Sequence, residues 1–207
     1  MSELPDLPPA AFAKVDPTPD SLFYALPRFV THLDARAIAG VTELYRAKLP
    51  DNATVLDLMS SWISHLPSDR VYRAVIGHGL NAQELAANPR LTRWFVQDLN
   101  LDPHLPLDAA SVDAVTMCAS VQYLQKPVAL FGEVRRVLRP GGIVVITFSN
   151  RCFPTKAVAI WTRLSAADRT GLVRRYLEQA GFSSISGDDI IPEGGGTDPL
   201  HAVAGRK

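Results

Sequence analysis

Three histidines lie at positions where a general base could act. His65 and His78 follow the first two stretches that read as strands, and His32 precedes them in a segment that also carries Tyr24 and Arg28. Imidazole titrates near neutral pH, so it is well suited to take a proton from a hydroxyl, an amine or an acid. We therefore expect His65 and His32 to be the catalytic candidates. For His65 and His78, a histidine at a helix end or on the surface is the alternative interpretation.

Two carboxylates stand near the ends of predicted strands. Asp57 lies in the apolar run 53–58 (ATVLDL), and Asp98 follows the run 93–97 (RWFVQ). In open α/β sheets, ligands bind outside the carboxyl ends of the strands, near the point where the strand order reverses. The loops at those ends are therefore the expected ligand edge: 59–65, 77–81, 98–101, 119–123 and 149–153.

The elements that must position these loops alternate along the chain. Apolar runs predict strands at 53–58, 71–76, 93–97, 112–119 and 143–149, and apolar spacing of three and four predicts helices at 34–49, 81–88, 127–138, 156–161 and 165–180. Two further runs, 183–191 and 199–204, have only a glycine-rich loop between them, so we expect an antiparallel hairpin. This order predicts a doubly wound α/β sheet. We divide the chain into an N-terminal extension with a lid helix (1–50) and one domain (51–207).

Composition narrows the classes of function. The chain has 207 residues with 21 basic and 21 acidic side chains, and this balance offers no electrostatic footprint for nucleic acid or an anionic membrane. Its two cysteines, Cys118 and Cys152, are too few for a disulfide framework or a metal site, and we expect Cys118 to be inert core. Apolar runs fall far short of a membrane span, and the acidic, proline-rich start is unlike a secretory signal. We therefore expect a cytoplasmic protein whose first 20 residues wrap the surface or stay mobile.

Three segments in order carry a resemblance to a known family. They are 105–115 (LPLDAASVDAV), 120–124 (SVQYL) and 133–142 (EVRRVLRPGG). With them the chain resembles class I S-adenosylmethionine-dependent methyltransferases, close to the branch called methyltransferase type 11. The resemblance implies a seven-stranded Rossmann-like sheet with an antiparallel final strand. It also implies S-adenosyl-L-methionine as cofactor and a small-molecule acceptor. From the charge balance, the short apolar runs and the two cysteines, we expect no nucleic-acid partner, no membrane partner and no metal.

The resemblance also implies a cofactor site, from which the chain departs at two points. Asp57 is retained, but Met59, Ser60, Ser61 and Trp62 replace the family's glycine loop, so we expect an ordinary turn there. At the ribose position the family has an acid and this chain has Gly79, for which Asn81 or Glu84 could substitute. The pair Asp98-Leu99 matches the residues that receive the adenine amino group. The predicted cofactor contacts are Asp57, Met59, Ser60, Ser61, Trp62, His78, Gly79, Asn81, Asp98, Leu99 and Ser120.

The acceptor side is predicted from the N-terminal segment and the loops after the fourth and fifth strands. Arg28 could clamp an acidic acceptor, and Tyr24 could form a wall of the site. A surface ion pair and a buried core tyrosine at Tyr123 are the alternatives. The predicted acceptor contacts are Tyr24, Arg28, Gln122, Tyr123, Asn150 and Arg151.

Two other interpretations use the same residues. The degenerate glycine loop suits a methyltransferase-like domain that has lost catalysis and serves as a binding or regulatory module. Residues 77–82 (GHGLNA), with Asp98 19 residues past Gly79, match the formal dinucleotide fingerprint of an NAD-binding protein. The methylated atom and the oligomeric state do not follow from the sequence.

Overall fold

A seven-stranded mixed sheet forms the centre of the computed structural model, which describes residues 4–207. The strand order is β3-β2-β1-β4-β5-β7-β6, and only β7 runs antiparallel to its neighbours. This confirms the predicted doubly wound sheet with its antiparallel hairpin. The strands are β1 Thr54–Leu58, β2 Ala74–Gly79, β3 Arg93–Val96, β4 Val112–Cys118, β5 Leu138–Phe148, β6 Ser183–Ile191 and β7 Leu200–Arg206.

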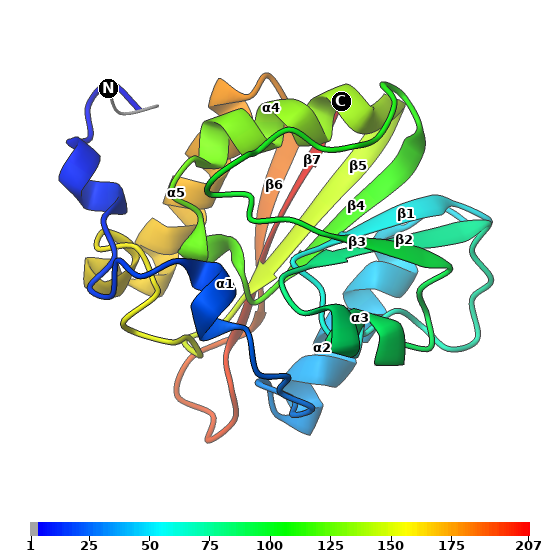
Figure 1. Ribbon diagram of the computed structural model, residues 1–207, viewed down its shortest axis with the longest axis horizontal. Helices are drawn as coiled ribbons and strands as arrows, with labels where there is room; N and C mark the ends of the chain where they lie inside the picture. Colours follow the sequence, from blue (N-terminus) through cyan, green and yellow to red (C-terminus); the bar gives the residue numbers. More distant parts are fainter. Residues whose placement is uncertain (1–3) are drawn as a thin grey trace.

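Helices cover both faces of the sheet (Figure 1). Apolar side chains of α4 and α5 pack on one face, and those of α2 pack on the other. Strand β5 alternates between the two layers: Val144 and Ile146 belong to the first and Val145 to the second, as its unbroken apolar run predicts. The helices are α1 Asp20–Phe23, α2 Ala35–Lys48, α3 Ala82–Ala87, α4 Pro127–Val137 and α5 Ala166–Gln179.

Helix α2 begins where the sequence predicts. The Asp34 carboxylate accepts a hydrogen bond from the amide of Ala37 at 2.8 Å, which satisfies a donor of the first turn. It also accepts from the amide of Asp198 at 2.7 Å, and the Asp198 carboxylate accepts from the amide of Asp34 at 2.9 Å. This reciprocal pair ties the start of α2 to the loop between β6 and β7.

The predicted helix at 156–161 does not form. Val158 instead makes an antiparallel bridge with Lys14, and the amides of Ala159 and Ile160 donate to carbonyls of residues 13 and 11. The backbone groups that a helix would pair internally are paired with the N-terminal segment, which the local apolar pattern could not reveal. Only the 3₁₀ turn Trp161–Arg163 follows.

The N-terminal segment packs against the domain. Phe12, at the end of the 3₁₀ helix Pro9–Phe12, is buried in the same apolar layer as α4 and α5. Residues 1–3 lie outside the described part. Within the described part, no helix is both long and apolar enough to cross a bilayer.

Gly79, at the end of β2, approaches the loop after β1 so closely that a side chain would not fit. A Cβ on Gly79 would lie 2.5 Å from the carbonyl oxygen of Ser60. We expect Gly79→Ala to lower the free energy of unfolding by about 1–3 kcal/mol, because a backbone must move to admit the methyl group.

Urea unfolding measures this, and Gly132→Ala in α4, where nothing lies within 4 Å, is the control. That helical substitution should raise stability by about 0.5–1 kcal/mol. Equal stability of Gly79→Ala and the unsubstituted protein would contradict the close approach.

Candidate functional site

A cavity of about 470 Å³ opens at the carboxyl ends of β1, β2 and β4. The loops after these strands and after β5 line it, together with residues 30–33 of the N-terminal segment. Most of the predicted site residues meet here, although they come from all parts of the chain. Those that line the cavity are Tyr24, His32, Asp57, Met59, Ser60, Ser61, His65, His78, Gly79, Ser120, Tyr123, Asn150 and Arg151.

The loop after β1 does not take the ordinary turn that we expected from its lack of glycine. Met59 has φ 53°, in the left-handed region that favours glycine, so the loop keeps a glycine-like backbone without a glycine. Such a conformation costs a residue with a Cβ about 1 kcal/mol. Two hydrogen bonds to His78 hold it: Met59 N donates to Nδ1 at 3.1 Å, and Ser60 N donates to the carbonyl oxygen at 2.6 Å.

His78 is a brace between strands. It lies within β2 and is almost fully buried, and its Nε2 donates to the carbonyl oxygen of Gln97 at 2.9 Å while Nδ1 accepts from Met59. Burial lowers the pKa of His78 to about 4, so the ring stays neutral at pH 7. Both ring nitrogens are engaged, so this histidine is not available as a base.

Asp57 supplies the carboxylate at the base of the cavity. It is buried and accepts hydrogen bonds from Ser60 Oγ at 2.6 Å and from Thr116 Oγ1 at 2.8 Å. Burial raises the pKa of Asp57 to about 6, although these hydroxyls partly offset the effect. The group is therefore mostly ionised at pH 7 and sits where a positively charged ligand would favour its charge.

The substitutes suggested for the ribose contact are engaged elsewhere. Asn81 caps α3 through its side-chain oxygen, and its amide donates to the carbonyls of Tyr24 and Ala25 at 2.9 and 3.2 Å. The carboxylate of Glu84 accepts from the hydroxyl of Ser61 and from the amide of Arg28. Neither residue lines the cavity.

Asp98 and Leu99 line a separate, smaller space of about 20 Å³. Asp98 Oδ1 accepts from the amide of Asn100 at 2.9 Å. Met59 and Tyr123 face both spaces, so their side chains help to form the wall between them. The predicted adenine end therefore lies next to the large cavity, and the side chains of Met59 and Tyr123 separate the two spaces.

Of the two catalytic candidates, His65 is the better placed. The residue lines the cavity, and its buried Nδ1 has no hydrogen-bond partner among the described residues. Burial lowers its pKa, so the imidazole is neutral at pH 7 and can accept a proton. His32 is exposed, with its ring edge-on to Phe153 at 5.3 Å, and burial of part of the ring lowers its pKa as well.

An aromatic wall closes the far side of the cavity. Phe153 lies at its centre, with ring centroids 6.3 Å from both Tyr24 and Tyr123, and the Phe153 amide donates to the Tyr123 hydroxyl at 2.9 Å. Beside this wall, Asn150 and Arg151 face the cavity, and Arg151 Nε lies 3.8 Å from an Asp198 carboxylate oxygen.

Besides Asn81, Asp98 and Leu99, three more predicted contacts do not line the cavity. Trp62 donates through Nε1 to the carbonyl of Val30, and Arg28 stacks on Phe23 with its guanidinium carbon 4.6 Å from the ring centre. Gln122 is fully buried and donates to the carbonyl of Ala119 at 2.8 Å. These side chains hold the segments that surround the site, and their contact with a ligand remains a prediction.

The sequence interpretation missed other cavity residues. Phe153 was not singled out. Cys118, expected as inert core, lines the cavity at the last position of β4, and Cys152 lines it from the loop after β5. Burial raises the pKa of Cys118 to about 12, so it stays a neutral thiol. Their position after a strand at the ligand edge was the signal that could have found them.

The dinucleotide fingerprint is not supported. Gly77 and Gly79 both lie inside β2 and not in a loop that opens a helix. A Cβ on Gly77 would meet the side chain of Leu91, so that glycine makes room for packing within the protein. The pattern is therefore not a phosphate cradle.

Part of the chain is similar to a family described as a methyltransferase domain. The family with that description matches residues 62–146. Malonyl-[acyl-carrier protein] O-methyltransferase of Hahella chejuensis (strain KCTC 2396) is 29% identical over 112 residues, which cover 51% of this chain and 39% of that protein. The chain therefore spans well under two thirds of the length of this curated relative.

Solved structures share the fold. The S-adenosylmethionine-dependent methyltransferase from Mesorhizobium loti superposes with a TM-score of 0.56 at 18% identity, covering 81% of this chain and 98% of that chain. The [4+2]-cyclase SpnF superposes with a TM-score of 0.61 at 15% identity, covering 81% and 80%. At such identities the likeness extends to the fold alone.

The raised pKa of Asp57 makes a prediction about stability. Because the folded-state pKa is about 6 and the unfolded value is near 3.8, the folded protein binds more protons between these values. The stability of the Asp57 protein relative to Asp57→Asn should therefore be greatest near pH 4, fall as the pH rises to about 6, and stay level above it. The shift corresponds to a total change of about 3 kcal/mol.

Urea unfolding of both proteins from pH 4 to 8 measures the difference. Subtracting the Asp57→Asn curve removes the contributions of all other titrating groups. A difference that does not change with pH would show that Asp57 ionises at its ordinary pKa.

Proposed function

We propose that this chain transfers a methyl group from S-adenosyl-L-methionine to a small-molecule acceptor in the large cavity, because residues 62–146 match a methyltransferase domain family and part of the chain is similar to an O-methyltransferase. The observation that carries this proposal is the convergence of Asp57, Ser120 and His65 on that cavity. Ser120 Oγ and His65 Nδ1 are buried and have no hydrogen-bond partner within the described residues. Unpaired buried polar atoms are costly unless a ligand or water pairs them, so these atoms point to a ligand.

The residues of the first half of the cavity fit the cofactor. Asp57 places negative charge where the cationic end of S-adenosylmethionine would lie, and the loop at Met59–Ser61 brings its backbone close without a glycine. Ser120 offers a hydroxyl from the opposite side, and Asp98 lies at the adenine end. The ribose carboxylate of the family has no counterpart at Gly79.

The chain's own part in the reaction is positioning and proton removal. S-adenosylmethionine supplies an electrophilic methyl group, and in-line transfer depends mainly on how the acceptor is held against it. Tyr24, Tyr123 and Phe153 exclude water from one side, and Arg151 with Asn150 offers hydrogen-bond donors to a polar acceptor. The neutral Nδ1 of His65 takes the proton from an acceptor hydroxyl or amine as the new bond to the methyl carbon forms.

One observation favours a second candidate function, a binding module without catalysis. The adenine end beside Asp98 has only about 20 Å³ of free space, which is room for about one water molecule. A domain that had lost its cofactor would have no need to keep that space open. The binding experiment below separates the two functions.

Calorimetric titration with S-adenosylhomocysteine tests the cofactor site. We expect micromolar binding that Asp98→Ala weakens at least tenfold, because a charge-assisted hydrogen bond to the adenine is lost. Asp102→Ala is the matched control: Asp102 Oδ1 accepts from the amide of His104 at 2.9 Å as Asp98 does from Asn100, but Asp102 is exposed and lines neither space. The absence of binding up to millimolar concentration by the folded chain would favour the binding module.

Once an acceptor is found by transfer of labelled methyl, His65→Gln tests the base. For a hydroxyl or amine acceptor we expect kcat to fall by about 10² to 10⁴. In the unsubstituted protein kcat should fall only at pH values below the ordinary histidine pKa, since burial lowers the pKa of His65. The exposed His104→Gln is the control, and unchanged kcat in His65→Gln would exclude His65 as the base.

A further inference from the structure

A short strap of the N-terminal segment, residues 16–24, lies across the adenine end of the site. It contains α1, and Asp20 at the start of α1 and Tyr24 just after its end line the small space beside Asp98. The first residue of the strap and the chain just before it are fastened to the domain: Asp16 N donates to the carbonyl of Thr155, and Lys14 forms a β-bridge with Val158. The strap therefore begins at a fixed point and covers the place where adenine would enter.

The strap is held by a lysine that no part of the proposed chemistry uses. Lys156 is fully buried, and its Nζ lies 3.0 Å from Asp16 Oδ2, 3.5 Å from Asp20 Oδ1 and 2.7 Å from the carbonyl oxygen of Thr18. Its ammonium also sits 5.4 Å from the centre of the Phe23 ring. Every polar contact of the Lys156 ammonium is with a residue of the strap, so among the described residues this charge holds no other segment in place.

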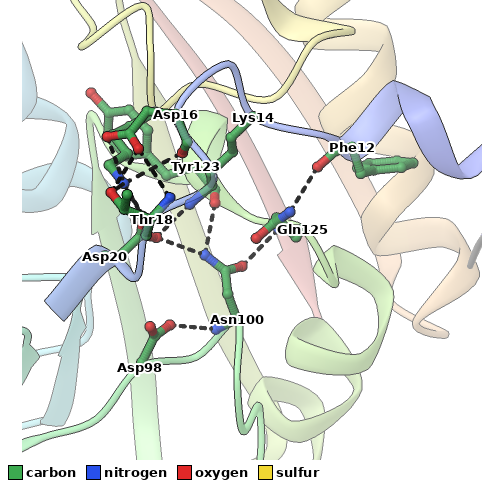
Figure 2. A network of polar contacts seen from close by, with 10 residues as sticks. Phe12, Lys14, Asp16, Thr18, Asp20, Asp98, Asn100, Tyr123 and Gln125 are labelled. Atoms are coloured by element: carbon green, nitrogen blue, oxygen red, sulfur yellow. Dashed lines mark hydrogen bonds and ion pairs between the residues drawn. The ribbon is translucent and has the colours of Figure 1, made fainter. Parts of the chain in front are cut away.

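Asn100 joins the same strap to the adenine end, as Figure 2 shows. Its side-chain amide donates to Asp20 Oδ2 at 3.1 Å and to the carbonyl of Tyr123 at 3.0 Å. Its backbone amide donates to Asp98 Oδ1, the carboxylate expected to receive adenine. Asp20 is also paired with Lys14, so three groups meet on this one carboxylate.

The latched strap and an adenine ring compete for the same space. Beside Asp98 there is room for about one water molecule, and the strap residues Asp20 and Tyr24 form one wall of that space. An adenine ring is many times larger than a water molecule. The space must therefore enlarge before adenine can reach Asp98, and the strap forms the wall of this space that comes from the N-terminal segment.

We propose that Lys156 is a positioning residue that latches the strap over the adenine end, and that this latch must release for the cofactor to enter. This inference rests on the proposed function, because it concerns the same cofactor site. When the binding-competent state is only a fraction of the population, the apparent affinity is reduced by that fraction. Weakening the latch raises the open fraction, so binding becomes faster and tighter although a buried ion pair is lost.

Lys156→Met tests the latch. Methionine fills the space of the lysine's apolar stem next to Phe23. Asp20 keeps its contacts with Lys14 and Asn100, and Asp16 keeps its two hydrogen bonds from Thr18, so the variant leaves no carboxylate of the strap unpaired. We expect the association rate of S-adenosylhomocysteine to rise at least fivefold by surface plasmon resonance. The dissociation constant should fall by a similar factor.

Arg136→Met is the matched control. Arg136 pairs with Glu133 and donates to the carbonyls of Leu105 and Leu107, a similar set of contacts, but it touches no residue of the strap. It should lower the melting temperature without changing the association rate. Asp20→Asn is a second test, which weakens the same latch with an isosteric side chain and should also speed association.

A folded Lys156→Met protein with an unchanged association rate or a weaker affinity would overturn the latch. Adenosine and L-methionine, titrated separately, sharpen the result: the variant should gain affinity for adenosine and none for methionine, because the strap blocks only the adenine end. Equal gains for both would also contradict the proposal. If neither protein binds an adenosyl ligand, the proposed function itself fails, which is a different outcome from binding that Lys156→Met leaves unchanged.

Discussion

The site depends on one buried imidazole. His78 accepts a hydrogen bond from the loop after β1 and donates one to the carbonyl of Gln97 beyond β3, so a single side chain in β2 fixes the carboxyl ends of three neighbouring strands. Both bonds require the neutral ring, and the depth of burial that lowers its pKa to about 4 keeps the ring neutral. The imidazole therefore holds the backbone of Met59 in a left-handed conformation, which a glycine would adopt without strain.

The same brace explains why Gly79 is glycine although the family's acid stands there. Ser60 follows the bonded Met59 and is pulled towards β2, so its carbonyl oxygen occupies the space that a side chain at position 79 would need. The side chains in the loop after β1 and the glycine at position 79 are therefore structurally linked. The loop after β1 lies against β2, and glycine at position 79 leaves the room that the Ser60 carbonyl oxygen needs.

Much of the fold could be predicted from local pattern, because alternating apolar runs and caps are local signals. Asp34 begins α2 and the run at 143–149 is buried on both faces, as the residue types indicate. The segment 156–161 could not be predicted, because its backbone is paired with residues about 145 positions earlier in the chain. The site was predictable to the same extent, because local signals could be recognised and contacts with distant residues could not. Strand ends indicated which loops meet, but the tasks of Asn81 and Arg28 depend on contacts with distant residues and leave no trace in local spacing.

The place of β7 in the sheet has a consequence for how the chain reaches this structure. This strand is the latest of the seven in chain order, yet it lies between β5 and β6 and not at an edge. During synthesis β5, which is buried along most of its length, must wait with one edge unpaired until β7 emerges. An apolar strand with a free edge is a site of aggregation. The nascent protein is therefore most vulnerable to aggregation after α5 has formed, and its need for a chaperone should end when β7 closes the sheet.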